Sequence, residues 1–130
     1  MKTIFIFSLF LFAHVSQAVP AGTKGKDGHF KVSEKSLNHL GVKFSLLSGS
    51  APWTISKSAL VRIKLTQGVY RRFEGELTYV IVKVVQEKND EVKMHSEDLE
   101  AGDEVAITGA KYLRMAETDL NSETVDNCAH

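Results

Sequence analysis

The sequence predicts a mainly β protein, a small antiparallel β-barrel or β-roll with one or two short helices. Two observations lead to this fold class. About six or seven short segments show the apolar patterns of strands, and glycine, asparagine, aspartate or proline residues separate them. Helical spacing of apolar residues is confined to two short stretches. Many short strands joined by tight turns are typical of small barrels and rolls.

The first 18 residues have the three-part layout of a secretory signal peptide. One basic residue precedes an apolar run over 4–12, and small residues follow at Ser16 and Ala18. The apolar run is too short to cross a bilayer, which needs about 20 apolar residues. We therefore expect cleavage after Ala18, with Ala21 as the second choice. The mature chain is then expected to be periplasmic and to have no membrane span.

Removal of the leader leaves about 112 residues, enough for one domain with a single core. The leader contains one of the 16 basic residues and none of the 16 acidic ones, so the formal charge becomes −1. A chain this close to neutral has no broad attraction for nucleic acid or anionic lipid. Cys128 is the only cysteine, so no internal disulfide can hold the domain together.

The first residues of the mature chain, 19–29, are polar and rich in glycine, which is typical of a flexible lead-in. Ser33 is expected to cap a short helix over 34–39. Its hydroxyl can accept a backbone N–H that the first helical turn leaves free. Gly41 can end this helix in the left-handed conformation.

Strand patterns follow this helix. Val42, Phe44 and Leu46 lie at alternate positions, which indicates a half-buried strand. After a loop rich in serine and glycine, the β pattern resumes at Trp53. Its alternation is clearest over 61–65.

Two further strands are expected on either side of a turn at residues 74–75. The second of them is apolar on both faces over 77–84, so we expect it to lie in the centre of a sheet. A polar hairpin turn over 87–90 leads to a short strand, in which Val92 and Met94 share one face.

The last part of the domain combines a turn, a strand and a helix. A turn at 102–103 precedes the strand, and apolar residues then recur at helical spacing over 110–120. Residues 121–130 have little to bury, so we expect a mobile tail. The predicted folded domain therefore covers residues 30–120.

The tail contains a candidate metal site. Cys128 and His130 flank a single alanine, and Asp126 precedes them by two residues. Thiolate and imidazole are soft ligands that suit Cu(I) or Zn(II). A stable zinc site needs three or four protein ligands, so another residue or a second chain would have to complete this one. The candidates within the chain are His29, His39 and His95. A solvated tail without metal is the alternative.

The residues favour a binding protein over an enzyme. The sequence lacks the Gly-x-Ser-x-Gly elbow of serine hydrolases. Glu97 and Asp98 are neighbouring carboxylates on an expected loop, where no apolar pocket would raise a pKa for acid–base catalysis. We therefore expect a non-enzymatic protein and assign no catalytic residue.

Two segments combine small and apolar residues in an ordered pattern. "ISKSALVR" contains Ser58, Leu60 and Val61, and "GVYRRFEG" contains Val69 and Tyr70. They resemble the Pro-x-Ser-Ala-Leu-Val segment and the Val-Tyr or Val-Phe strand of periplasmic adaptor subunits. These subunits are the membrane fusion proteins of resistance–nodulation–division (RND) efflux pumps, and the heavy-metal group is the most similar.

A third segment, "DLEAGDEVAITGAKYLR", resembles the Gly-Leu-x-x-Gly-Asp-x-Val-Val-x-x-Gly pattern of the same family. Gly102, Asp103 and Gly109 stand at matching positions. Asp98 and Ala106 replace a glycine and a valine that the family often has. The similarity extends over the predicted domain and is confined to the C-terminal, membrane-proximal part of an adaptor.

The resemblance implies an accessory protein of an efflux system. An adaptor also has a lipoyl-like domain and a long helical hairpin, and the sequence has no heptad run for such a hairpin. We therefore expect a shortened, stand-alone relative that docks on a full adaptor or on the inner-membrane pump. The alternative is a small periplasmic carrier of copper or zinc that uses Cys128 and His130.

Overall fold

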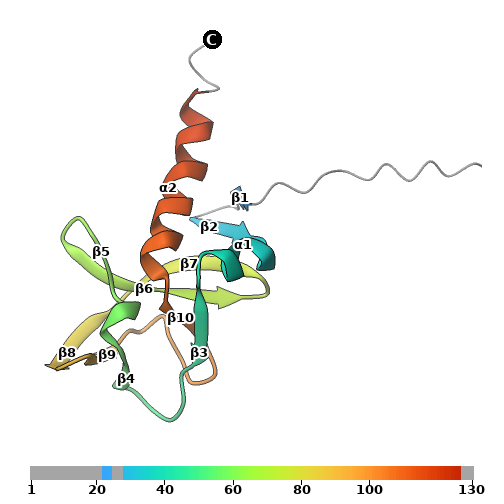
Figure 1. Ribbon diagram of the computed structural model, residues 1–130. Coiled ribbons are helices and arrows are strands. Elements are labelled where there is room, and N and C mark those ends of the chain that lie inside the picture. The colour runs from blue at the N-terminus through green and yellow to red at the C-terminus, as the bar shows by residue number, and fades with distance from the viewer. Residues whose placement is uncertain (1–21, 25–27, 127–130) are drawn as a thin grey trace, which may run out of the picture.

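The computed structural model describes residues 22–24 and 28–126, and the fold over these residues is mainly β with antiparallel sheets (Figure 1). This confirms the predicted fold class. The strands are β1 (Gly22–Lys24), β2 (His29–Val32), β3 (Lys43–Leu46), β4 (Trp53–Ser56), β5 (Val61–Ile63), β6 (Thr66–Phe73), β7 (Glu76–Ile81), β8 (Lys83–Lys88), β9 (Glu91–His95) and β10 (Glu104–Thr108). The helices are α1 (Glu34–His39), the short 3₁₀ helix η1 (Lys57–Ala59) and α2 (Ala110–Asp126).

The strands form two sheets. The larger sheet has the order β1-β2-β7-β6-β10-β3, and β5 pairs with β6 in addition. The smaller sheet has the order β4-β9-β8. The chain passes from the larger to the smaller sheet at Val82, between β7 and β8. β7 lies between β2 and β6, which confirms the prediction of a central strand.

Two tight turns form where the sequence predicts them. Glu74 and Gly75 have φ values of 51° and 78° and join β6 to β7, where Phe73 pairs with Glu76. Positive φ at both central positions is the geometry that matches the right-handed twist of a hairpin. The second turn follows β8, and its Asn89 has a φ of 53°.

Helix α1 begins and ends at the predicted residues. The Ser33 hydroxyl accepts the backbone N–H of Ser36 at 3.2 Å, and Gly41 has a φ of 68°. Leu37 is buried on the inner face of the helix. This helix therefore covers one part of the larger sheet before the chain enters β3.

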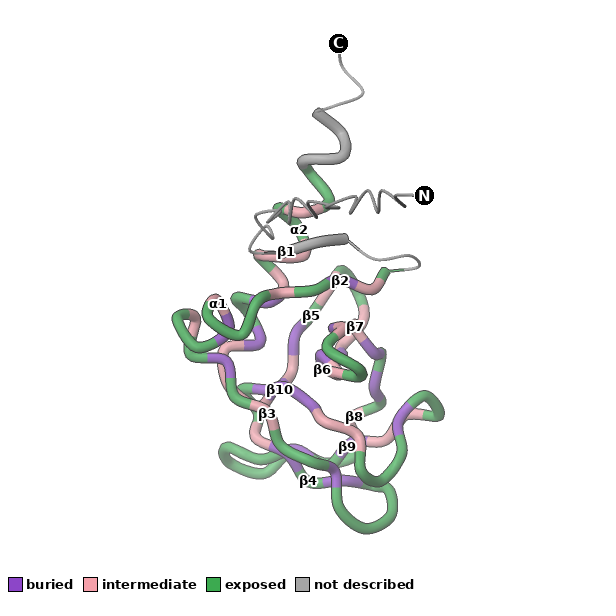
Figure 2. Tube along the Cα trace, turned by 90° about the vertical axis from the view of Figure 1, so that its right-hand side faces the viewer, coloured by how far each residue is buried: buried purple, intermediate pink, exposed green. Residues whose placement is uncertain are grey.

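The buried residues of the described chain, purple in Figure 2, form two hydrophobic clusters, and adjacent residues of one strand contribute to different clusters. In β6, Val69 belongs to the first cluster and Tyr70 to the second. In β10, Val105 and Ala106 divide in the same way. All four are 0% exposed. The first cluster lies between the two sheets and includes Trp53, Ile55, Val92 and Met94, whereas the second lies beneath the two α-helices.

Two of the expected strands differ in extent from the observed ones. The predicted strand over 77–84 is divided at Val82, because the chain there leaves one sheet and joins the other. The alternation over 61–65 does not continue to its end. Lys64 has a φ of 55° in the turn between β5 and β6, and this turn leaves Leu65 98% exposed.

The ends of the domain also differ from the predicted boundaries. Helix α2 continues to Asp126, past the expected end of the helix at residue 120 and into the segment expected to be a tail. β1 lies within the expected lead-in and pairs with β2. The predicted signal peptide and residues 127–130 lie outside the described residues.

Candidate functional site

Ser58 connects two of the adaptor-like segments. It lies in η1, where the Ser56 hydroxyl accepts the backbone N–H of Ser58 at 3.4 Å. The Ser58 hydroxyl donates a hydrogen bond to the carbonyl of Ile107 in β10. The next residue, Ala59, is completely buried in the first cluster. This short helix therefore fastens the connection between the two sheets onto β10.

Leu60 and Val61 continue this segment into the core. Leu60 is partly buried against the first cluster, whereas Val61 is buried in the second and pairs with Gly68 of β6. These two residues thus contact both clusters, as the alternation of a strand requires.

The turn at Gly102 and Asp103 is bound to the end of β3. Gly102 has a φ of 92°, and its N–H donates to the Leu47 carbonyl at 2.7 Å. The Leu47 N–H donates to the Asp103 carbonyl at 2.8 Å. The Asp103 carboxylate accepts the Glu100 N–H at 2.9 Å and lies 3.8 Å from Arg71 Nη1. The Asp103 N–H also donates to the Glu100 carbonyl at 3.2 Å, so four hydrogen bonds and one ion pair hold the turn.

Gly109 lies at the junction of β10 and α2. It has a φ of 72°, and a Cβ at this position would lie 3.0 Å from Val42 Cα. Only glycine suits both the conformation and this close approach. The adaptor-like residues Ser58, Gly102, Asp103 and Gly109 therefore act in this fold as scaffold residues. Leu99 and Val105 of the third segment pack with Ala59 and Val69 of the first two in one cluster.

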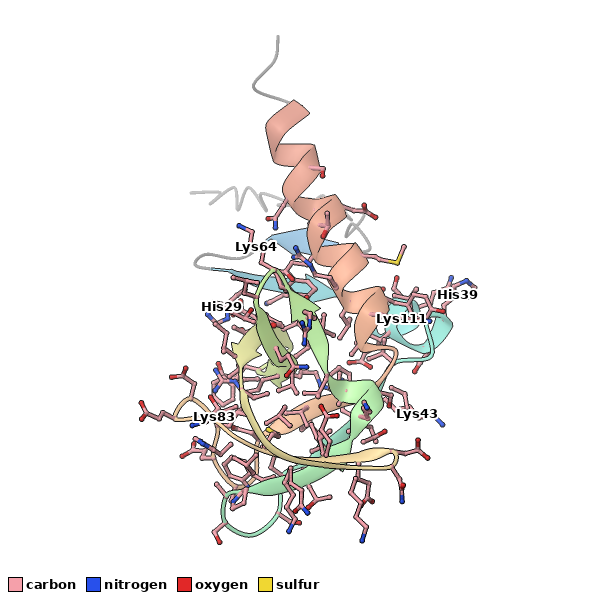
Figure 3. The ribbon with its side chains drawn as sticks, turned by 90° about the vertical axis from the view of Figure 1, so that its left-hand side faces the viewer. His29, His39, Lys43, Lys64, Lys83 and Lys111 are labelled. Atoms are coloured by element: carbon pink, nitrogen blue, oxygen red, sulfur yellow. The ribbon has the colours of Figure 1, made fainter. Side chains whose placement is uncertain are left out.

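The candidate metal ligands are only partly within the described residues. Asp126 is the last residue of α2, and Cys128 and His130 lie outside. Residues 28–122, whose side chains are described, contain no group of three or more histidine, cysteine, aspartate or glutamate residues that could hold a metal ion. His29 and His39 lie on different sides of the molecule (Figure 3), so they cannot complete the same site. The copper or zinc site stays a prediction.

Tyr70 is a titratable group with a strongly perturbed pKa. Burial, the hydrogen bond to Glu117 and the charge of Glu117 raise the pKa of Tyr70 far above its usual value. The ring lies against Phe30 and Tyr79, with centroid distances of 5.8 Å and 5.6 Å. Its hydroxyl faces helix α2 through the bond to Glu117. Tyr70 thus joins the helix to the sheet, which is a structural role.

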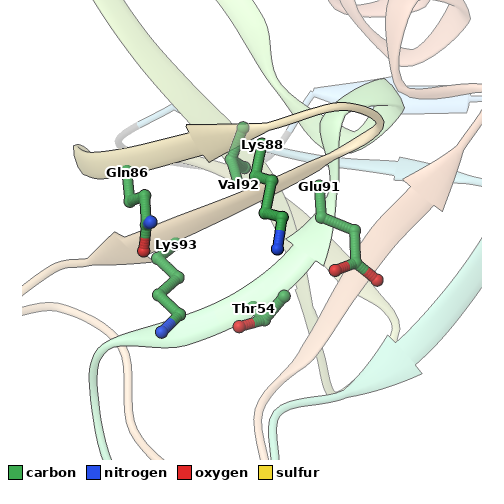
Figure 4. A pocket seen from close by; sticks show the side chains of 6 residues that line it. All are labelled: Thr54, Gln86, Lys88, Glu91, Val92 and Lys93. Atoms are coloured by element: carbon green, nitrogen blue, oxygen red, sulfur yellow. The ribbon is translucent and has the colours of Figure 1, made fainter.

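Grooves open at the surface of the smaller sheet. One, of about 250 Å³, is lined mainly by long polar side chains, among them Gln86, Lys88 and Lys93 (Figure 4). A second, of about 460 Å³, lies between β3 and β4, which are edge strands of different sheets. The first groove is lined mostly by exposed residues of ordinary strands, whereas the second reaches buried core residues, among them Leu47, Trp53 and Val105.

A third groove, of about 480 Å³, has a different character. Two large apolar side chains line it: Leu46 at the end of β3 is 62% exposed, and Phe73 at the end of β6 is 63% exposed. Glu74 and Glu100 also line it. The alternation of β3 predicts a buried Leu46, but the buried residue is Leu47. The N–H and the carbonyl of Leu47 both bond to the turn before β10, and this turns its side chain inward.

Sequence reasoning missed this groove because its two apolar residues come from strands that are far apart in the chain. One signal was available: Phe73 directly precedes the tight turn at 74–75, where a strand leaves the cover of neighbouring strands. We name this the acidic groove, formed by Leu46, Phe73, Glu74, Glu100 and their neighbours 101–104, together with Arg72 and Gly75.

Comparison with protein-family models, with curated proteins and with solved structures gave no match. The resemblance to efflux adaptors therefore depends on the sequence segments alone. Over the part of the chain that the structure describes, no helix has both the length and the apolar character that a membrane span requires.

Proposed function

We propose that this chain is an exported, non-enzymatic accessory protein of an RND-type efflux system. The substrates of that system would be heavy metals, and the chain would act by docking on the adaptor or the pump. The observation that carries the proposal is the convergence of the three adaptor-like segments. Ser58 of the first segment bonds to β10 of the third, and Val69 of the second packs with Val105. Segments that resemble one family in sequence thus form one continuous body.

Docking suits the surface better than catalysis does. The acidic groove exposes two large apolar side chains beside carboxylates. Apolar residues surrounded by charged ones are typical of surfaces that recognise proteins. A function in docking also agrees with the scaffold role of the adaptor-like residues, which hold the shape of the domain and contact no reacting group.

The test is direct binding between purified proteins. The mature chain would be titrated onto the immobilised full-length adaptor and inner-membrane pump of the same organism, and binding followed by biolayer interferometry. We expect at least one of them to bind with a Kd between about 1 µM and about 100 µM, the range of a small transient interface. An unrelated periplasmic protein of similar size and charge is the control. Absence of binding to both efflux components overturns the proposed function.

A further inference from the structure

The acidic groove lies at one end of the larger sheet. Glu104 of β10 pairs with Leu46 of β3 on one side and with Arg72 of β6 on the other. Leu46 and Phe73 therefore flank the start of β10, and both line the groove. In Figure 1 the tip of the β6–β7 hairpin and the segment before β10 lie on the same side of the molecule as β3. Exposed single apolar residues are common, but two that line one groove form a patch.

Four carboxylates and one arginine line the groove, so its lining has a net negative charge. Segments 71–76 and 97–104 contain seven acidic residues and two arginines, although the whole chain has equal numbers of acidic and basic residues. Both arginines are engaged within the fold. Arg72 pairs with Glu104 at 2.7 Å and with Glu34 at 3.3 Å, and it lies 3.8 Å from the centre of the Phe44 ring.

The arginines pair with two of the four carboxylates that line the groove, Asp103 and Glu104, and leave the other two without an ion pair in the described part of the chain. Arg71 lies 3.8 Å from Asp103 and donates to the Asp98 carbonyl at 2.9 Å. Glu74 and Glu100 form no ion pair with any of the described residues. The groove therefore presents two apolar side chains together with two carboxylates, Glu74 and Glu100, that no basic group of the described fold neutralises.

Contacts within the fold fix the walls of the groove in the free protein. The turn at 102–103 is bonded to Leu47, and Phe73 pairs with Glu76 across the hairpin. Rigid walls lower the entropy that binding costs, because little of the surface has to become ordered.

We propose that the acidic groove binds a basic segment of the efflux partner, with an apolar side chain of that segment between two lysine or arginine residues. The apolar side chain would contact Leu46 and Phe73, and the flanking cations would neutralise Glu74 and Glu100. The inference rests on the proposed function for the identity of the partner. An anionic lipid surface is a poor occupant, since its headgroups would be repelled by the same carboxylates.

Synthetic peptides test the chemistry of the groove without the partner. The probe is a short fluorescent peptide of alternating lysine and leucine. Two matched peptides carry glutamate in place of lysine, or serine in place of leucine. Fluorescence anisotropy with the full mature chain should show binding of the lysine–leucine peptide only, weakening as salt rises from about 0.05 M to about 0.5 M. Equal binding of the lysine–serine peptide overturns the proposal, because it would need no apolar contact.

Variants locate the binding on the protein. Phe73→Ser, and separately the pair Glu74→Gln and Glu100→Gln, should each weaken binding about tenfold or more. Leu65→Ser is the matched control, since Leu65 is 98% exposed and lies at a different turn. The double variant Glu74→Gln/Glu100→Gln keeps the test valid if Phe73→Ser fails to fold. If the double variant binds the lysine–leucine peptide with the affinity of the wild type, the proposal is overturned.

Two further outcomes separate this proposal from the proposed function. If the purified adaptor or pump binds the wild-type chain and the groove variants equally well, the groove is wrong as the docking site while the function stands. If neither component binds but the peptide result holds, the function fails and the chemistry of the groove is supported. Self-association that Phe73→Ser abolishes would assign the groove to a second copy of the chain and overturn the proposal.

Discussion

The hydroxyl of Tyr70 in β6 donates a hydrogen bond to the carboxylate of Glu117 in α2, residues that are 47 positions apart in the chain. Arg114 pairs with the same carboxylate at 3.4 Å. The Glu117 side chain is only 16% exposed. The bond therefore attaches the C-terminal helix to the middle of the larger sheet.

Tyr70→Phe should lower the free energy of unfolding by about 1–3 kcal/mol, because it leaves a largely buried carboxylate with one partner fewer. Urea unfolding followed by circular dichroism measures this change. Tyr112→Phe is the matched control: Tyr112 is exposed on the same helix, and its hydroxyl has no hydrogen bond to the described residues. A loss in Tyr70→Phe no larger than in this control would show that the bond contributes nothing.

The same tyrosine predicts a loss of stability in alkali. The raised pKa of Tyr70 results first from burial and then from Glu117, while Arg114 acts in the opposite direction. A pKa that is higher in the folded than in the unfolded chain contributes stability below about pH 10 and loses it as pH rises further. The free energy of unfolding should therefore fall more steeply above about pH 10 in the wild type than in Tyr70→Phe. Parallel curves for the two proteins would contradict this expectation.

Ser58→Ala should lower the free energy of unfolding by about 1 kcal/mol, because the Ile107 carbonyl loses its hydrogen-bond donor. Ser48→Ala is a suitable control, since Ser48 is exposed in the β3–β4 connection and its hydroxyl has no bond to the described residues. Thermal and urea unfolding of the two variants give the comparison. Equal stabilities would mean that Ser58 does not fasten η1 to β10.

Gly68→Ala should lower the free energy of unfolding by about 1–3 kcal/mol through overpacking. A Cβ at this position would lie 2.5 Å from both the Tyr79 ring and the Val80 carbonyl oxygen. Gly75→Asn serves as the control, because that turn has open space and asparagine tolerates its φ of 78°. Urea midpoints distinguish the two, and a stable Gly68→Ala would contradict the close approach of the strands.

The predicted metal site at Cys128 and His130 is tested by titrating the reduced, mature protein with Cu(I) and Zn(II) against a competing chelator. Cys128→Ser and His130→Ala should each weaken binding, because thiolate and imidazole are the expected soft ligands. A protein that ends at Asn127 should lose the binding altogether. Equal affinity in the full and shortened proteins would assign these residues to a tail without a metal function.

Local signals account for the parts of the fold that could be predicted. The β6–β7 hairpin was visible in the sequence because Gly75 suits the positive φ of its turn, whereas the positive φ of Glu74 is unusual for its residue type. Ser33 and Gly41 delimit α1 for the same reason, since capping depends on neighbouring residues only. The apolar character of both faces correctly indicated a central strand over 77–81, whereas residues 83–84 belong to β8 at the edge of the smaller sheet.

Long-range pairing accounts for most of what could not be predicted. The chain changes sheets at Val82 because β8 pairs with β9 while β7 pairs with β6, and no local signal marks that exchange. The acidic groove likewise depends on β3 and β6 lying on either side of β10. The contacts of Ser58, Gly102, Asp103 and Gly109 give these adaptor-like residues a scaffold role. The Cys128 and His130 site stays a prediction.

The two hydrophobic clusters have a consequence for how this chain can change in length. Val69 and Tyr70 lie next to each other in β6 and enter different clusters, as do Val105 and Ala106 in β10. A single-residue insertion or deletion in either strand would exchange the contents of both clusters at once, because neighbouring side chains point to opposite faces. Natural variation in length should therefore collect in the exposed connection over 48–52, while β6 and β10 keep a constant number of residues.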